Sequence, residues 1–448
     1  MAQQGQQRGE NAAAYLRVIL LAAAIGIPAA FLAAAFLAAV HWLENWLWTD
    51  LPHDLGATTP PWYLVLGLPV AGAGVVIAAR VLLPGDGGHP PLNGLSTKPT
   101  PLRYGPGVAL AALGTLAFGP VLGPEAPLIA LGSVVGMTVA PFMKNDPQAQ
   151  SVLATAGSFS AISALFGGPL VAGMLLTEAA VGMGTALIPA LLPGLVAAAI
   201  GYVIFLGLGT WGGIHQSVLT VPGLPKYHST SVPDLLIGIG VGIAAALVIA
   251  VVRLIGNRVD GLPLHRGPAA GHGHARLATL LLGGALVVGL LALLARALGA
   301  DSQDVLFSGQ ASVPALVAQQ SLKIVLVLLV AKALAYAVSL GCGFRGGPVF
   351  PAIFLGVALA SLAEIIFNTS PTLAVAVGAA GGMAAMTRLL FAPVLFAILL
   401  VGDNGLGTVS AAVLASAAAW LLTMTLERRQ EAAAAAARAS PTTAGSPG

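Results

Sequence analysis

Charged residues are scarce in this chain of 448 residues. Only 8% of them are Asp, Glu, Lys or Arg, whereas soluble domains carry about 25%. A soluble fold of this length would have too few charged side chains to cover its surface, so a soluble enzyme or binding domain is excluded. The formal net charge is only +3, and no basic stripe lies among aromatic residues, so we expect no nucleic-acid partner.

Cysteine and the usual catalytic patterns are also nearly absent. Cys342 is the single cysteine, so the chain forms no internal disulfide, and we expect this side chain to act as a small core residue. The sequence contains no HExxH, GxSxG or paired-aspartate motif. We therefore expect no enzyme, no cofactor and no metal site.

Apolar residues and glycine are abundant instead. Hydrophobic residues make up 57% of the chain, glycine occurs 57 times, and the mean hydropathy is +0.91. The apolar run from Val18 to Val40 is too long for the core of a signal peptide and has no clear cleavage site, so it predicts a first membrane helix. Further apolar segments follow to the end, which predicts an all-α polytopic membrane protein.

Several of these apolar segments are too short to cross a bilayer, which takes roughly 20 helical residues. They are interrupted by Gly-Pro pairs, namely Gly119-Pro120, Gly123-Pro124 and Gly347-Pro348. Broken helices are tolerated within a membrane only where they are buried in protein or line a polar cavity. The pattern therefore favours the interior of a transporter or channel over a simple anchor.

The distribution of arginine predicts the orientation of the chain. Arginines gather in the loop around 253–276 and in the C-terminal tail, whereas the loop near 209–232 holds only Lys226. By the positive-inside rule, the mid-chain loop and the C-terminus lie in the cytoplasm. We expect both termini to be cytoplasmic and the protein to reside in the plasma (inner) membrane.

An internal repeat is the most informative feature. The pattern G-P-x-x-P-x-I-x-L-G occurs at 123–132 and again at 347–356, and the same spacing of 224 residues aligns Pro169 with Pro393. Two matches at one spacing indicate a duplicated half, and an odd number of crossings in each half would make the halves inverted. The predicted organisation is a cytoplasmic segment (1–14), a first membrane repeat (15–208) and a second membrane repeat (209–426). The second repeat contains a cytoplasmic linker (257–275), and a disordered cytoplasmic tail (427–448) follows it.

The repeated motif has a direct physical meaning. Each copy is a Gly-Pro break followed by an apolar helix, and proline suits a helix start because the N–H it lacks would be unpaired there. The helix N-terminus offers free N–H groups and the positive end of the dipole. Two such ends from opposite halves would bind an anion near the midplane of the membrane without a full positive charge.

Two glutamates lie near these breaks. Glu125 lies between Pro124 and Pro127 at the head of an apolar helix, where its carboxylate would occupy the place that an anion prefers. We expect it to gate the site and to release it when protonated; the simpler alternative is a helix cap. Glu178 lies late in the helix that begins at Pro169, and it is either a possible inner proton relay or a residue at the helix end.

At these motifs the chain resembles the CLC family of chloride channels and proton/chloride antiporters. Gly123–Pro127 resembles the family motif GREGP, 347–351 resembles GxFxP, and 85–90 resembles the GSGIP region. The resemblance implies an anion site built from three segments, with Glu125 as the gate, and a homodimer in contact through the helices beginning near Pro169 and Phe391. The anion-binding residues it implies are Gly87, Gly88, His89, Pro90, Gly123, Pro124, Ala126, Pro127, Gly347, Pro348, Val349, Phe350 and Pro351.

The chain also departs from the family pattern. Gly87 stands where the family has a serine, Pro348 has no N–H to donate, and no tyrosine follows Tyr336 to serve as the pore tyrosine. The inner proton-transfer glutamate of the family aligns with Ala179, one residue from Glu178. The resemblance therefore implies transport of chloride or similar anions, channel-like or loosely coupled to protons.

Three alternatives stay open. One is an antiporter that couples protons fully. Another is an inverted-repeat carrier of an organic solute, for which the chain offers few polar groups at mid-membrane, and a third is a relative that does not transport. We expect membrane lipid and small anions as partners.

Overall fold

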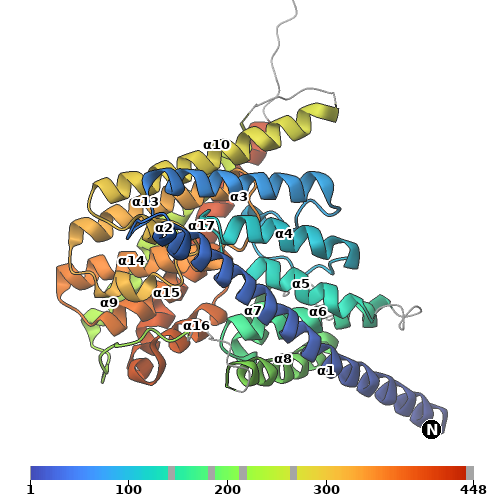
Figure 1. Cartoon of the computed structure of the whole chain (residues 1–448). Coiled ribbons are helices and arrows are strands. Elements are labelled where there is room, and N and C mark those ends of the chain that lie inside the picture. The colour runs from blue at the N-terminus through green and yellow to red at the C-terminus, as the bar shows by residue number, and fades with distance from the viewer. Residues whose placement is uncertain (1, 140–146, 180–186, 211–218, 263–269, 440–448) are drawn as a thin grey trace, which may run out of the picture.

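The computed structural model describes residues 2–139, 147–179, 187–210, 219–262 and 270–439 (Figure 1). Across these ranges every regular element is a helix and no strand forms. Eight helical stretches within them are long and apolar enough to cross a membrane. The chain is therefore an all-α, multi-pass membrane protein, as its composition predicted.

The long helices fall into two series. The first comprises α1 (Ala2–Asn45), α3 (Trp62–Leu82), α4 (Gly105–Leu116), α5 (Glu125–Met137), α6 (Pro147–Leu165), α7 (Pro169–Ala179) and α8 (Leu187–Thr210). The second comprises α9 (Val232–Asp260), α10 (Ala270–Ala297), α13 (Leu322–Gly341), α14 (Val349–Phe367), α15 (Pro371–Thr387), α16 (Phe391–Val401) and α17 (Val409–Ala439). The short elements are η1 (Trp46–Asp50), α2 (Leu51–Asp54), η2 (Pro91–Asn93), η3 (Leu102–Tyr104), α11 (Ser302–Val305), α12 (Val313–Ala318) and η6 (Gly402–Thr408).

The helix boundaries repeat with the spacing of the sequence motif. α5 and α14 begin 224 residues apart, at Glu125 and Val349, and α6 and α15 begin at the prolines with the same separation. α5 packs on α6 and α14 packs on α15, and Figure 1 shows the first pair on the right and the second on the left. The fold is the pair of inverted-topology repeats that the motif indicated.

Glycine allows the helices of each pair to approach closely. A Cβ added to Gly132 of α5 would lie 2.4 Å from the carbonyl oxygen of Gly157, and one added to Gly356 of α14 would lie 2.1 Å from that of Gly378. Both distances are too short for a real side chain, so the final glycine of each motif sets the contact between neighbouring helices. This explains why glycine occurs at the same place in both copies.

The two repeats meet at their Gly-Pro breaks. The Gly123 N–H donates to the Gly347 carbonyl at 2.7 Å, and the Gly347 N–H donates back to the Gly123 carbonyl at 2.5 Å. Equivalent residues thus form one antiparallel bridge. Since α5 and α14 each begin two residues after the bridge, their N-termini lie close together.

The predicted segment boundaries fall inside helices of the structure. The division at 208/209 falls in the last turn of α8, and the candidate first span begins at Ala13. The tail that was expected to be disordered from residue 427 continues α17 as far as Ala439, because its alanine-rich sequence favours helix. The linker at 257–275 includes the end of α9 and the start of α10; residues 263–269 and 440–448 lie outside the described residues.

Candidate functional site

Glu125 is the centre of the site. It is the first residue of α5, it is fully buried, and its Oε1 accepts a hydrogen bond from the backbone N–H of Val349, the first residue of α14. The backbone N–H groups of Phe350 and of Glu125 itself also lie close to this carboxylate. A negative group from one repeat therefore lies at the positive end of the helix that begins the other repeat.

The second carboxylate oxygen of Glu125 is buried and has no hydrogen-bond partner among the described residues. The space around it depends on two glycines. A Cβ on Gly123 would lie 2.1 Å from Oε2, and a Cβ on Gly347 would lie 2.1 Å from the carboxyl carbon. The sequence needs glycine at both positions so that the carboxylate can reach the helix N-terminus.

The remaining motif residues surround this carboxylate. Pro124 and Pro348 precede the first helical residues and cannot donate, so the donors at the start of α14 are Val349 and Phe350. In the first turns of the two helices Pro127, Phe350 and Pro351 are buried, while Ala126 is half-buried. Although Pro348 has no N–H, the next residue, Val349, therefore supplies a backbone donor at the start of α14.

Tyr336 is the residue that sequence reasoning missed. It lies in α13, is fully buried, and its hydroxyl donates to the Pro348 carbonyl at 2.6 Å. It also lies close enough to Glu125 to interact with the charge of that carboxylate. The signal available in the sequence was a tyrosine in the apolar segment just before the second Gly-Pro motif, whereas the family resemblance implied a tyrosine on the C-terminal side of that motif.

The segment 85–90 contributes backbone rather than side chains. Residues 85–88 have φ of 92°, 50°, 68° and 103° in order, which favours glycine at nearly every position. A Cβ on Gly87 would lie 2.8 Å from the Cβ of Ala111, so no serine fits there. Gly88 is half-buried, His89 and Pro90 are exposed, and the three-residue turn η2 follows them. None of the hydrogen bonds of the described residues joins this segment to Glu125.

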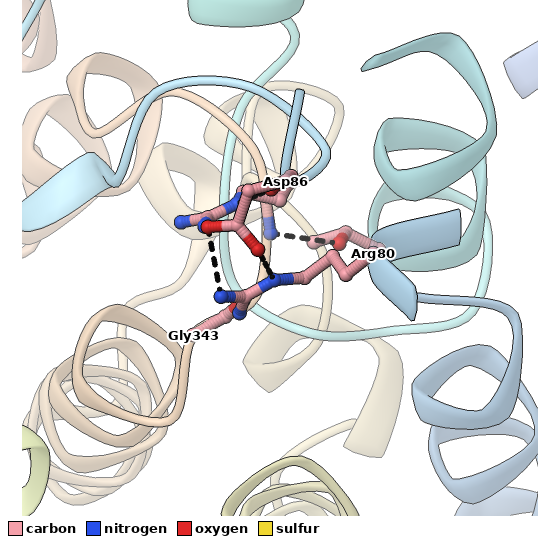
Figure 2. A network of polar contacts seen from close by, with 5 residues as sticks. Arg80, Asp86 and Gly343 are labelled. Carbon is pink, nitrogen blue, oxygen red and sulfur yellow. Dashed lines mark hydrogen bonds and ion pairs between the residues drawn. The ribbon is translucent and has the colours of Figure 1, made fainter. Parts of the chain in front are cut away.

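Asp86 ties this segment to the second repeat. Figure 2 shows its carboxylate pointing toward Arg80, whose Nε and Nη2 donate to it at 2.7 and 3.0 Å. Arg80 also donates to the Gly343 carbonyl at 2.7 Å, and the buried Arg345 donates both to the carboxylate and to the carbonyl of Asp86. The network holds the chain just before Gly347 in place.

Glu178 caps another helix. Its carboxylate accepts hydrogen bonds from the N–H groups of Leu390, Phe391 and Ala392, at 3.0, 3.0 and 2.8 Å. These groups belong to the start of α16, so the end of α7 in the first repeat is fixed to its counterpart in the second. The arrangement favours the helix-end interpretation of Glu178 over the proton relay.

Two separate hollows lie in the described part of the structure. A cavity of about 770 Å³ reaches Pro124 and Phe350 at the candidate site and is also lined by 219–222. A pocket of about 250 Å³ is lined by the C-terminal part of α9, from Ile249 to Asn257. No residue of α9 lines the larger cavity, and no residue is shared between the two linings.

The chain is similar to known proteins over most of its length. A model of the family described as "Voltage gated chloride channel" matches residues 91–421. The chain is 30% identical over 353 residues to the "Putative ion-transport protein YfeO" of Escherichia coli (strain SMS-3-5 / SECEC), covering 77% of this chain and 78% of that protein.

Two crystal structures share the fold. One is a slow cyanobacterial Cl−/H+ antiporter, with a TM-score of 0.70, 18% identity and coverage of 93% of this chain and 98% of that one. The other is a CLC-type fluoride/proton antiporter, with a TM-score of 0.71, 22% identity and coverage of 92% and 96%. At these identities the likeness shows the common fold alone.

Proposed function

Because the chain belongs to the voltage gated chloride channel family, we propose that it moves chloride or a similar small inorganic anion across the membrane. The observation that carries the proposal is the buried Glu125 carboxylate on the N–H groups that begin α14. A helix N-terminus binds anions through its free N–H groups and its dipole. A carboxylate held there occupies the place of the transported anion.

Glu125 is the gate in this proposal. While its carboxylate is ionised it competes with an anion for Val349 and Phe350, and when it is protonated it has less affinity for the helix end. Its release exposes the N–H groups at the start of α14 to the cavity that reaches Pro124 and Phe350. Binding by backbone dipoles instead of a lysine keeps the anion exchangeable.

Proton coupling is loose in this proposal. Ala179 occupies the position of the inner proton-transfer glutamate and cannot carry a proton. Glu178 is engaged as a cap by three N–H groups at the start of α16, which leaves it poorly placed to act as a relay. Full antiport is the second candidate, because the two similar solved structures are antiporters of protons with chloride and with fluoride.

We also propose that two copies associate through α7 and α16, with both termini in the cytoplasm and the protein in the inner membrane among lipid. Leu170 and Phe391, near the starts of these helices, have 74% and 58% of their surface exposed. Apolar side chains this exposed need either lipid or a second copy to cover them. Chemical crosslinking in native membranes would distinguish a second copy, which would give a crosslinked dimer, from lipid, which would not.

Anion efflux from liposomes that contain the purified protein tests the proposal. Chloride, bromide, nitrate and fluoride are loaded in turn, and efflux is recorded with and without a pH gradient. We expect efflux above that of protein-free liposomes, weak discrimination among chloride, bromide and nitrate, and little uphill proton movement. Efflux no faster than in protein-free liposomes would refute anion transport, and proton pumping at a fixed ratio would establish full antiport.

A further inference from the structure

A second carboxylate is held by positive groups, at some distance from Glu125. The pocket of about 250 Å³ lies between α9, α15 and α17, and its lining includes Arg253, Arg388 and Glu427. Glu427 Oε1 accepts from Arg388 Nε at 2.8 Å and from Arg388 Nη2 at 2.6 Å, and Arg253 donates to the same oxygen. One carboxylate oxygen therefore accepts hydrogen bonds from two guanidinium groups, so these three side chains together carry a net positive charge. Glu431, an exposed residue of α17, also lines the pocket.

The cluster is open enough for a small solute to enter. The side chains of Arg253, Glu427 and Arg388 are 20%, 22% and 43% exposed. Thr423 also lines the pocket; this residue is 7% exposed, and its Oγ1 is buried and has no hydrogen-bond partner among the described residues. A buried donor without a partner beside two arginines is what an anion would satisfy.

Arg388 is held in an unusual conformation at this place. It ends α15 with a φ of +61°, a region that residues with a Cβ seldom adopt. The indole N–H of Trp420 donates to its backbone carbonyl at 3.0 Å, and its own N–H donates to Ala384. The guanidinium is therefore presented to the pocket by a fixed backbone.

The pocket is connected to the candidate site through Arg253. Arg253 lies close enough to Tyr336 for an electrostatic interaction, and the Tyr336 hydroxyl donates to the carbonyl of Pro348 at the head of α14. Arg253 thus lines the pocket and is linked through Tyr336 to the helix start that holds Glu125. An anion that enters from the face where α9 ends would meet Arg253 before it meets α14.

We infer that Arg253 and Arg388 form a docking site for a small inorganic anion, and that the Glu427 carboxylate occupies this site until an entering anion displaces it. The inference rests on the proposed anion transport, and it assigns the step before the anion reaches α14. Glu427 acts here as Glu125 does at the centre, as a tethered carboxylate in the place of an anion. Two arginines attract the anion, and competition from Glu427 keeps it from being held too tightly.

The alternative is an ion-pair cluster that only joins α9, α15 and α17. The two accounts differ in the expected effect of removing the acid. If the cluster is structural, Glu427→Gln leaves two arginines in repulsion and weakens the protein without improving anion binding. If Glu427 competes with the anion, the same substitution frees the arginines and raises the affinity for chloride.

The test uses the full chain in liposomes and in detergent. Chloride flux is measured against chloride concentration for wild type, Glu427→Gln, Arg253→Gln, Arg388→Gln and the control Arg258→Gln, which removes the same charge from an exposed position of α9. In detergent, the rise of the melting temperature with added chloride reports binding independently of flux. We expect Glu427→Gln to lower the half-saturating chloride concentration about fivefold, and the substitutions at Arg253 and Arg388 to raise it by a similar factor.

Arg258→Gln should leave that concentration unchanged. The inference is overturned if the variants at Arg253, Arg388 and Glu427 behave like Arg258→Gln, or if Glu427→Gln weakens chloride binding. If the wild-type protein moves no anion at all, the proposed function fails, and the detergent measurement alone then decides whether Glu427 competes with chloride for the docking site.

Discussion

Glu125 and Val349 occupy equivalent positions in the two repeats, and the side chain of the first accepts a hydrogen bond from the backbone of the second. The scaffold around them is symmetric, because Gly123 and Gly347 exchange reciprocal hydrogen bonds beside them. The site itself is asymmetric, since one repeat supplies a carboxylate and the other supplies N–H groups and an apolar side chain. The two repeats thus have equivalent helix starts, and at the first helical residue they differ because one has the acidic Glu125 and the other has Val349.

Gly347→Ala should imitate the loss of the gate. Its new Cβ would lie 2.1 Å from the carboxyl carbon of Glu125, which is the end of a flexible side chain, so the glutamate moves while the backbone stays. We expect anion flux to lose its dependence on external pH while the protein still folds. The melting temperature should fall by the equivalent of about 1 kcal/mol or less, the contribution of one hydrogen bond.

A matched control is Gly74→Ala in α3, where a Cβ meets nothing within 4 Å. It should leave both the flux and its pH dependence as in wild type. Wild-type pH dependence in Gly347→Ala would mean that the carboxylate does not need to reach α14 in order to regulate transport.

Gly87→Ser tests whether the family's serine can simply be restored. The residue has a φ of +68°, and its Cβ would lie 2.8 Å from Ala111 and 3.1 Å from Arg80 Cγ. We expect a loss of about 1–3 kcal/mol of stability from the strained backbone and the clash, with no gain in preference for chloride over nitrate. Melting curves and competition flux assays measure the two effects. A stable variant with sharper selectivity would show that the loop adapts and that the serine position still faces the anion.

Glu178→Ala separates a helix cap from a proton relay. The substitution leaves three N–H groups at the start of α16 without their acceptor, which should cost about 1 kcal/mol or somewhat more, as for other lost N-terminal caps. The melting temperature should fall, and the ratio of protons to anions moved should stay as in wild type. A changed ratio at unchanged stability would instead assign Glu178 to proton transfer.

Sequence reasoning predicted the repeat, the helix starts and Glu125 because these depend on local rules. A Gly-Pro pair followed by an apolar run favours a helix start, and an isolated glutamate in an apolar helix start stands out in the sequence. The spacing of 224 residues was visible without coordinates, and the structure begins α5 and α14 with that spacing.

Other features depend on contacts between distant segments, which a single sequence does not show. Tyr336 approaches Glu125 only because α13 packs behind the start of α14, and Asp86 meets Arg345 across 259 residues. The left-handed backbone at Gly87 explains why a glycine replaces the family's serine, but only once Ala111 and Arg80 are placed beside it. Position in the sequence likewise gave no sign that Glu178 would reach the first turn of α16.

The most direct test of the central claim is anion flux through wild type and Glu125→Gln in liposomes, across a series of external pH values from neutral to acidic. Wild-type flux should rise as the pH falls, because protonation neutralises the carboxylate and releases it from the N–H groups of Val349 and Phe350. Glu125→Gln carries no competing charge at any pH, so its flux should be high throughout and independent of pH. If the two proteins show the same pH dependence, Glu125 is only a helix cap and the proposed gate is wrong.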